Sequence, residues 1–224
     1  MTIDYRVSVT SIDSYRYFVS SEMETEAHIR RLLRLEPPTE AMRTGIEFHQ
    51  MLENFFQRRS PMPVFMNAHT VLMRPDAMEV PVHRLYDIRG RTVRLGGRID
   101  AVRGLTIIDY KTTSRTINLE KYADAFQWQA YLDLYPTAKH FRYDVFLLRR
   151  GVVVEHAHLM LHRFAELSNV VTAWLDEYCQ HLDDLADSGW IRNRDGRLLP
   201  GPTFLATLED TELAFVRKRF KLAA

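Results

Sequence analysis

Over the first forty residues, apolar and polar positions recur with helical spacing. The segments SIDSYRYF and EAHIRRLLRL predict two helices, with Thr10 or Ser11 as the capping residue of the first. Pro37-Pro38 is expected to end this stretch, because proline cannot continue a helix. A further helix is predicted over about 44–58, closed by the prolines of the segment PMP at 61–63. Its apolar face consists of Ile46, Met51, Leu52, Phe55 and Phe56.

A β-rich block follows, in which short apolar runs are separated by turn residues. Three strands are predicted over 80–85, 92–102 and 105–112, with hairpin connections at Asp87–Arg91 and at Arg103-Gly104. The remaining predicted elements are a helix over about 118–134, strands over 141–149 and 152–161 around Arg150-Gly151, a helix over about 164–186, a loop over 196–202 and a helix over 207–220. This order predicts an α/β fold in which a mixed central β-sheet is flanked by helices.

The composition is that of a globular protein. The chain has 224 residues, of which 46% are hydrophobic and 26% charged, which suits a single domain over 1–224. We expect its core at about 40–161, with helical segments at 1–36 and 162–224. No apolar run approaches the ~20 residues that cross a bilayer, and the N-terminus lacks the pattern of a signal peptide. An intracellular, cytoplasmic location without membrane attachment is therefore expected.

Charge and cysteine content narrow the possible chemistry. Thirty Lys and Arg residues face 29 Asp and Glu residues, so the net charge of +1 gives no global attraction to nucleic acid. Basic residues cluster locally at 28–35, 84–98 and 217–221, where the simplest interpretation of each is a solvated face. Because Cys179 is the one cysteine, the chain has no internal disulfide and no cysteine-based zinc or iron–sulfur site.

Charged residues inside the second predicted hairpin are the sharpest local feature. Buried charge is costly unless it is paired or bound to a metal, and Asp109 and Lys111 point to one face of their strand. If the turn is a two- or four-residue loop, Val102 lies opposite Leu105, Asp100 opposite Ile107 and Arg98 opposite Asp109. Two converging carboxylates favour a cation such as Mg²⁺ or Mn²⁺ between them. A surface ion pair between Asp109 and Lys111 is the alternative.

Two helices add polar residues at a spacing of four. His49 and Glu53 share a helix face with Gly45, and Gln127 and Tyr131 form a similar pair after the Lys111 strand. Each pair, taken alone, is typical of an ordinary helix.

The order of these motifs is more informative than any one of them. Gly45-xxx-His49 comes first, and Glu79 then opens a strand. Gly97-Arg98-Ile99-Asp100, Asp109-Tyr110-Lys111-Thr112-Thr113 and Gln127-xxx-Tyr131 follow in that order. Over about Thr10 to Leu161, this order and spacing resemble the RecB-type exonuclease branch of the PD-(D/E)XK nuclease superfamily.

The resemblance implies a restriction-endonuclease-like core that cuts DNA with Mg²⁺ or Mn²⁺, as an exonuclease or end-processing enzyme of recombination, repair or phage DNA metabolism. It implies His49, Asp100, Asp109 and the main-chain carbonyl of Tyr110 as metal ligands. Lys111 would be the catalytic lysine, acting with Asp100 and Asp109. The residues expected to organise the site or contact DNA are Gln127, Tyr131, Glu79 and Arg98.

The chain also departs from some relatives. The four cysteines of iron–sulfur members are absent, so no iron–sulfur cluster is expected. No Walker A sequence occurs, so a helicase, like a single-strand annealing protein, would be a separate partner. A homo-oligomer is compatible with the sequence. The alternatives to a nuclease are a non-catalytic nucleic-acid-binding module with the same fold and a structural protein whose motif residues form ion pairs.

Overall fold

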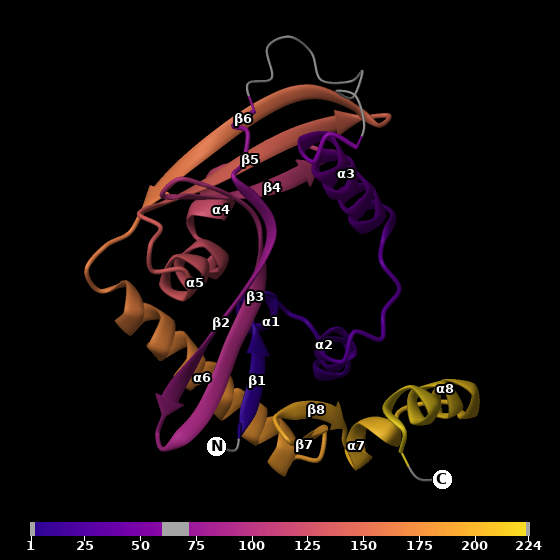
Figure 1. The fold of residues 1–224 in the computed structure, drawn as a ribbon. Coiled ribbons are helices and arrows are strands. Elements are labelled where there is room, and N and C mark those ends of the chain that lie inside the picture. The colour runs from indigo at the N-terminus through magenta and orange to yellow at the C-terminus, as the bar shows by residue number, and fades with distance from the viewer. Residues whose placement is uncertain (1–2, 60–71, 223–224) are drawn as a thin grey trace. The chain divides into compact units, whose positions relative to one another are not determined.

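Helices and strands alternate along the chain in a mixed α/β fold. A computed structural model describes residues 3–59 and 72–222, and Figure 1 labels the helices and strands that they form. The elements of the first half are β1 (Tyr5–Ser8), α1 (Val9–Val19), α2 (Thr25–Leu32), α3 (Glu40–Phe56), β2 (Ala77–Ile88), β3 (Arg91–Arg103) and β4 (Thr106–Thr113). Those of the second half are α4 (Glu120–Ala123), α5 (Phe126–Leu134), β5 (His140–Arg149), β6 (Val152–His162), α6 (Leu167–Asp187), β7 (Ile191–Arg194), β8 (Arg197–Pro200), α7 (Pro202–Leu205) and α8 (Asp210–Phe220).

The chain forms two compact units. The first, here called the sheet unit, comprises residues 37–82 and 97–167, and the second, the helical unit, comprises residues 1–36, 83–96 and 168–224. The long strands β2 and β3 each begin in one unit and end in the other.

The sheet unit contains a mixed β-sheet. β3 pairs with β4 and β5 with β6 in antiparallel fashion, whereas β4 and β5 run parallel. The parallel pair is possible because α4 and α5 carry the chain back between the two strands. The expected central mixed sheet flanked by helices is thus confirmed, although the predicted helix over 118–134 is two helices separated by Asp124-Ala125.

The hairpin between β3 and β4 turns at Gly104-Leu105, where Gly104 has a φ of +53°. Val102 lies opposite Ile107 and Ala101 opposite Ile108. The predicted register, with Val102 opposite Leu105, is therefore wrong by two residues, because Leu105 belongs to the turn. A shift of two preserves the faces, so Asp109 and Lys111 still point to the side expected for them.

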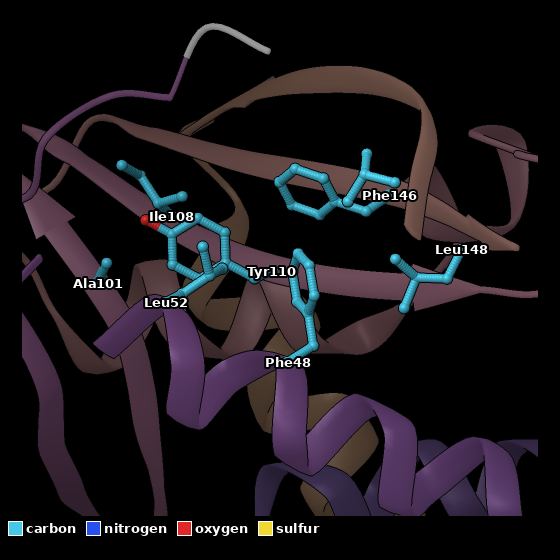
Figure 2. Packing of buried hydrophobic residues seen from close by; sticks show 8 residues of the cluster. Phe48, Leu52, Ala101, Ile108, Tyr110, Phe146 and Leu148 are labelled. Atoms are coloured by element: carbon cyan, nitrogen blue, oxygen red, sulfur yellow. The ribbon is translucent and has the colours of Figure 1, made fainter. Parts of the chain in front are cut away.

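Helix α3 covers one face of this sheet (Figure 2). Phe48 and Leu52 of α3 pack against Ile108 and Tyr110 of β4 and against Phe146 of β5. The side chains of Leu52, Ile108 and Phe146 are completely buried, and each such side chain contributes roughly 1.5–3 kcal/mol through burial. Because side chains alternate along a strand, this packing leaves Asp109 and Lys111 on the other face of β4.

The helical unit begins with a strand that the sequence analysis missed. β1 pairs in parallel with β3, from Tyr5 opposite Val93 to Ser8 opposite Gly96. Only four residues alternate in β1, too few to stand out beside the helix that follows. Ser8 caps α1 and forms a capping box with Ser11, so the predicted caps Thr10 and Ser11 were placed too far along the chain.

The C-terminal part of the helical unit corrects another prediction. β7 and β8 form a small antiparallel hairpin, and α7 starts at Pro202, so residues 196–202 are not a simple loop. Helices α6 and α8 each begin three residues later than predicted and end within one residue of the predicted position. Pro61 and Pro63 lie outside the described residues. No helix in the described ranges is long and apolar enough to span a membrane.

Candidate active site

The candidate site forms where β3 separates from β4. Their pairing ends at Ala101 and Ile108, and side chains bind the main chain of Tyr110 beyond that point. The Tyr110 N–H donates to Oδ2 of Asp100 at 2.9 Å, and the Tyr110 carbonyl accepts a hydrogen bond from Nε2 of His49 at 2.7 Å. Strand separation therefore leaves the N–H and the C=O of Tyr110 to a carboxylate and an imidazole, so the two side chains meet at one residue.

Asp109 lies on the neighbouring position of β4 and is almost completely buried. Its Oδ1 atom accepts a hydrogen bond from Nε2 of Gln127 at 2.9 Å, and its Oδ2 atom lies 2.7 Å from Nζ of Lys111. No other group among the described residues donates to that Oδ2 atom. Gln127 and Lys111 thus orient the two oxygens of one buried carboxylate.

Asp100 is the second carboxyl group of the site. Extending the β3–β4 register by one residue places it opposite Asp109. Burial raises the pKa of Asp100 well above its ordinary value, and the negative charge of Asp109 raises it further, while Lys111 acts in the opposite direction. Additional positive charge would relieve the electrostatic repulsion between these two carboxyl groups.

Lys111 remains positively charged in this setting. Burial by itself lowers its pKa, but Asp109 and Asp100 outweigh burial and raise the pKa above that of an ordinary lysine. The ammonium also lies 5.8 Å from the ring centre of Tyr143, a residue that the sequence analysis did not select. An aromatic residue in an apolar strand gives no sequence signal for such a position.

His49 is half-buried, and burial lowers its pKa, so the imidazole is neutral at pH 7. Because Nε2 donates to Tyr110, the Nδ1 atom is unprotonated and lies 3.5 Å from Oδ2 of Asp100. Glu53, one turn further along α3, instead accepts hydrogen bonds from Gln50 and Gln57. Of the predicted pair on this helix, only His49 belongs to the site.

Tyr131 anchors the segment of β3 that precedes Asp100. Its hydroxyl donates to the Arg98 carbonyl at 2.9 Å and accepts from the Arg98 N–H at 3.3 Å. A Cβ atom on Gly97 would lie 2.7 Å from the Tyr131 ring, so this close approach requires glycine. Gly97 and Tyr131 belong to separate motifs in the sequence, but they contact each other in the structure.

Glu79 and Arg98 form an ion pair at the edge of the site, with 3.3 Å between Oε2 and Nη1. The φ of Glu79 is +54°, which is rare for a residue with a side chain and costs of order 1–3 kcal/mol. The Arg98 side chain is largely exposed. This guanidinium is thus available to solvent while Glu79 fixes one of its ends.

The donor set can be tested against a divalent cation. Carboxylate oxygens, a neutral imidazole and a main-chain carbonyl are ligands of the type that Mg²⁺ and Mn²⁺ accept, and a neutral imidazole is ready for coordination. Within the described ranges, however, no three His, Cys, Asp or Glu side chains are grouped closely enough to form a ready-made metal site. The chemical types of these ligands therefore suit a divalent cation. In this structure, His49 and Asp100 instead form hydrogen bonds with the main chain of Tyr110.

Comparison with known proteins assigns the chain to a family. Residues 64–198 match the PD-(D/E)XK nuclease superfamily, and the chain belongs to that superfamily. No curated protein matches the chain.

One solved structure shares the fold, and two further structures show weaker similarity. SSO0001 is 18% identical in sequence, and the match covers 81% of this chain and 78% of SSO0001 with a TM-score of 0.56. A candidate exonuclease from Eubacterium rectale is 10% identical, with 83% and 82% of the two chains covered and a TM-score of 0.47. The alkaline exonuclease LHK-Exo from Laribacter hongkongensis is 17% identical, with 82% and 92% covered and a TM-score of 0.42.

Proposed function

We propose that the protein is a Mg²⁺- or Mn²⁺-dependent deoxyribonuclease of the RecB-type branch that acts at DNA ends as an exonuclease. The observation that carries this proposal is the convergence of Asp100, Asp109 and Lys111 where β3 leaves β4. A binding module has no need of two carboxyl groups placed against each other beside a half-buried lysine. Superfamily membership over residues 64–198 supports the same conclusion.

The residues that would hold the cation are His49, Asp100, Asp109 and the carbonyl of Tyr110. When bound, the cation supplies positive charge to the phosphate and to an activated water. Gln127 keeps the Asp109 carboxylate oriented through its hydrogen bond to Oδ1. Tyr131 holds the main chain of Arg98, and with it the approach to Asp100.

Lys111 contributes positive charge beside the two carboxyl groups. Because Asp109 and Asp100 raise its pKa, the amine is an ammonium at neutral pH. Its Nζ atom can neutralise charge that develops on a phosphate oxygen in the transition state. Arg98, exposed at the rim of the site, is suited to contact a neighbouring phosphate of the strand.

The proposal is tested with end-labelled linear DNA and purified protein in Mg²⁺, Mn²⁺ or EDTA. We expect metal-dependent degradation whose rate falls ~10²–10⁴-fold in Lys111→Ala. The control variant Lys139→Ala, at an exposed lysine elsewhere in the sheet unit, should keep a near wild-type rate. Near-normal cleavage by Lys111→Ala would contradict the assignment. DNA retained on a gel without cleavage in either metal would favour the non-catalytic binding module.

A further inference from the structure

The helical unit contains a cavity of about 520 Å³ whose lining residues all belong to that unit. It lies among the β1–α1 junction, the end of α2, strand β8 and the end of α8. None of the residues implicated in cleavage contributes to it.

The lining of the cavity is strongly basic. It includes Arg6, Arg31, Arg34 and Arg197 and contains no aspartate or glutamate. Arg6 donates to a main-chain oxygen, and the nearest carboxylate to Arg31 is that of Glu36, 3.8 Å away. Within the described ranges, Arg34 and Arg197 have no ion-pair partner. Four guanidinium groups therefore gather here with little compensating charge.

The rest of the lining divides into hydroxyl and apolar groups. Hydroxyls come from Ser8, the capping residue of α1, and from Thr10 and Ser14 in its first two turns. Leu32, Leu198 and Phe220 provide half-buried apolar surface. Guanidinium and hydroxyl groups suit phosphate oxygens, and apolar side chains suit the face of a base.

We propose that this cavity binds single-stranded nucleic acid, with one or two phosphates at the arginines and an unpaired base against the apolar wall. The inference rests on the proposed function, since a nuclease works on a strand that could occupy such a site. A paired base is stacked within a duplex and cannot enter a cavity of this size, whereas a single strand can present its bases. The basic segment at 28–35 is thus part of a binding site rather than only a solvated face.

The test is equilibrium binding of a fluorescent single strand of about 20 nucleotides to the full chain in EDTA, which prevents cleavage. Arg34→Gln combined with Arg197→Gln should weaken binding about tenfold or more at about 0.1 M salt, and should reduce the slope of log affinity against log salt by about 1.4. The matched control combines Arg103→Gln with Arg192→Gln, which remove the same charge from exposed positions outside the lining. Its affinity should stay within about twofold of the wild type.

A second variant guards against misfolding of the first. Ser14→Glu adds a carboxylate to the lining without removing an arginine, and it should also weaken binding of the single strand. Thermal melting identifies any variant that is unfolded. Affinity that responds to neither variant, an equal loss in the control, an effect confined to duplex DNA, or equal displacement of the strand by polyglutamate would each overturn the proposal.

Cleavage measured in parallel separates this inference from the proposed nuclease. If Lys111→Ala abolishes cleavage but the cavity variants bind normally, the nuclease assignment stands and the cavity proposal fails. If the wild type never cleaves but the cavity variants lose the single strand, the cavity proposal stands and the nuclease assignment fails.

Discussion

His49 on α3 donates a hydrogen bond from Nε2 to the main-chain oxygen of Tyr110 on β4, with 2.7 Å between the two atoms. The contact ties the helix to the strand at the residue whose main-chain N–H also donates to Asp100. The main chain of Tyr110 thereby gathers an imidazole from a helix and a carboxyl group from the adjacent strand.

Replacing His49 should weaken metal activation. In His49→Ala, the Mn²⁺ concentration for half-maximal cleavage should rise by about 10-fold or more, since a candidate ligand and the donor to Tyr110 are both lost. Titration of cleavage against Mn²⁺ measures this shift. His83→Ala, at an exposed histidine of β2, is the control, and an unchanged Mn²⁺ dependence of His49→Ala would exclude a role for the imidazole at the metal.

Replacing Gln127 should reduce activity through Asp109. Gln127→Ala leaves Oδ1 of a buried carboxylate without its donor, and we expect a loss of about 10–100-fold in cleavage rate or metal affinity. The control is Gln129→Ala on the same helix. Equal activity of the two variants would show that the hydrogen bond to Asp109 does not matter for the reaction.

Two glycines should respond in opposite directions to alanine. Gly97→Ala brings a Cβ within 2.7 Å of the Tyr131 ring, so the ring must move, at an expected cost of about 1–3 kcal/mol. In Gly45→Ala the nearest atom is Oγ1 of Thr112 at 3.4 Å, and alanine should favour the helix by up to about 1 kcal/mol. Urea denaturation measures both free energies of unfolding. Equal effects would contradict the close approach of Gly97 to Tyr131.

A buried histidine pair should make folding sensitive to acid. His28 is completely buried, its Nε2 atom lies 3.0 Å from that of His181, and its ring stacks on Phe18. Burial, assisted by His181, lowers the pKa of His28 to about 4. The unfolded chain, with a histidine pKa near ~6.5, binds the proton more readily, so stability should fall as pH decreases from about 6.5 to about 4.

The contribution of His28 to this pH dependence is at most about 3 kcal/mol. Chemical denaturation at several pH values should show a shallower decline for His28→Gln than for the wild type. His83→Gln should keep the wild-type slope. A wild-type slope in His28→Gln as well would assign the acid sensitivity to other groups.

A buried ion pair on the α3 side of the sheet should be costly to break singly. Asp144 is completely buried, and it accepts hydrogen bonds from Arg142 and contacts His156 at 2.8 Å. Asp144→Asn should destabilise the protein by about 3–5 kcal/mol, because it leaves the Arg142 charge without its partner. Arg142→Met combined with Asp144→Leu should be much less harmful. If the double variant lost more stability than Asp144→Asn, the ion pair itself would be a net source of stability.

Short-range patterns were sufficient for most elements and for the faces of the site strand. The alternation of Ile108 and Tyr110 with Asp109 and Lys111 placed the two charges together, and a register error of two residues left that conclusion intact. The same reasoning missed β1, β7 and β8, because four-residue strands take their stability from pairing, β1 with β3 and β7 with β8. The β1 strand becomes evident only from its pairing with residues 93–96.

The sequence by itself thus determined the order of the motifs, the mixed α/β architecture and the shared face of Asp109 and Lys111, since each follows from local periodicity and residue chemistry. Tertiary structure alone decided that His49 and Asp100 meet at the main chain of Tyr110 and that Gly97 must leave room for the Tyr131 ring. It also brought arginines from both ends of the chain, Arg6 and Arg197, to one cavity. The physical reason is that such contacts depend on where β3 departs from β4 and on how distant segments pack, and no local pattern carries that information.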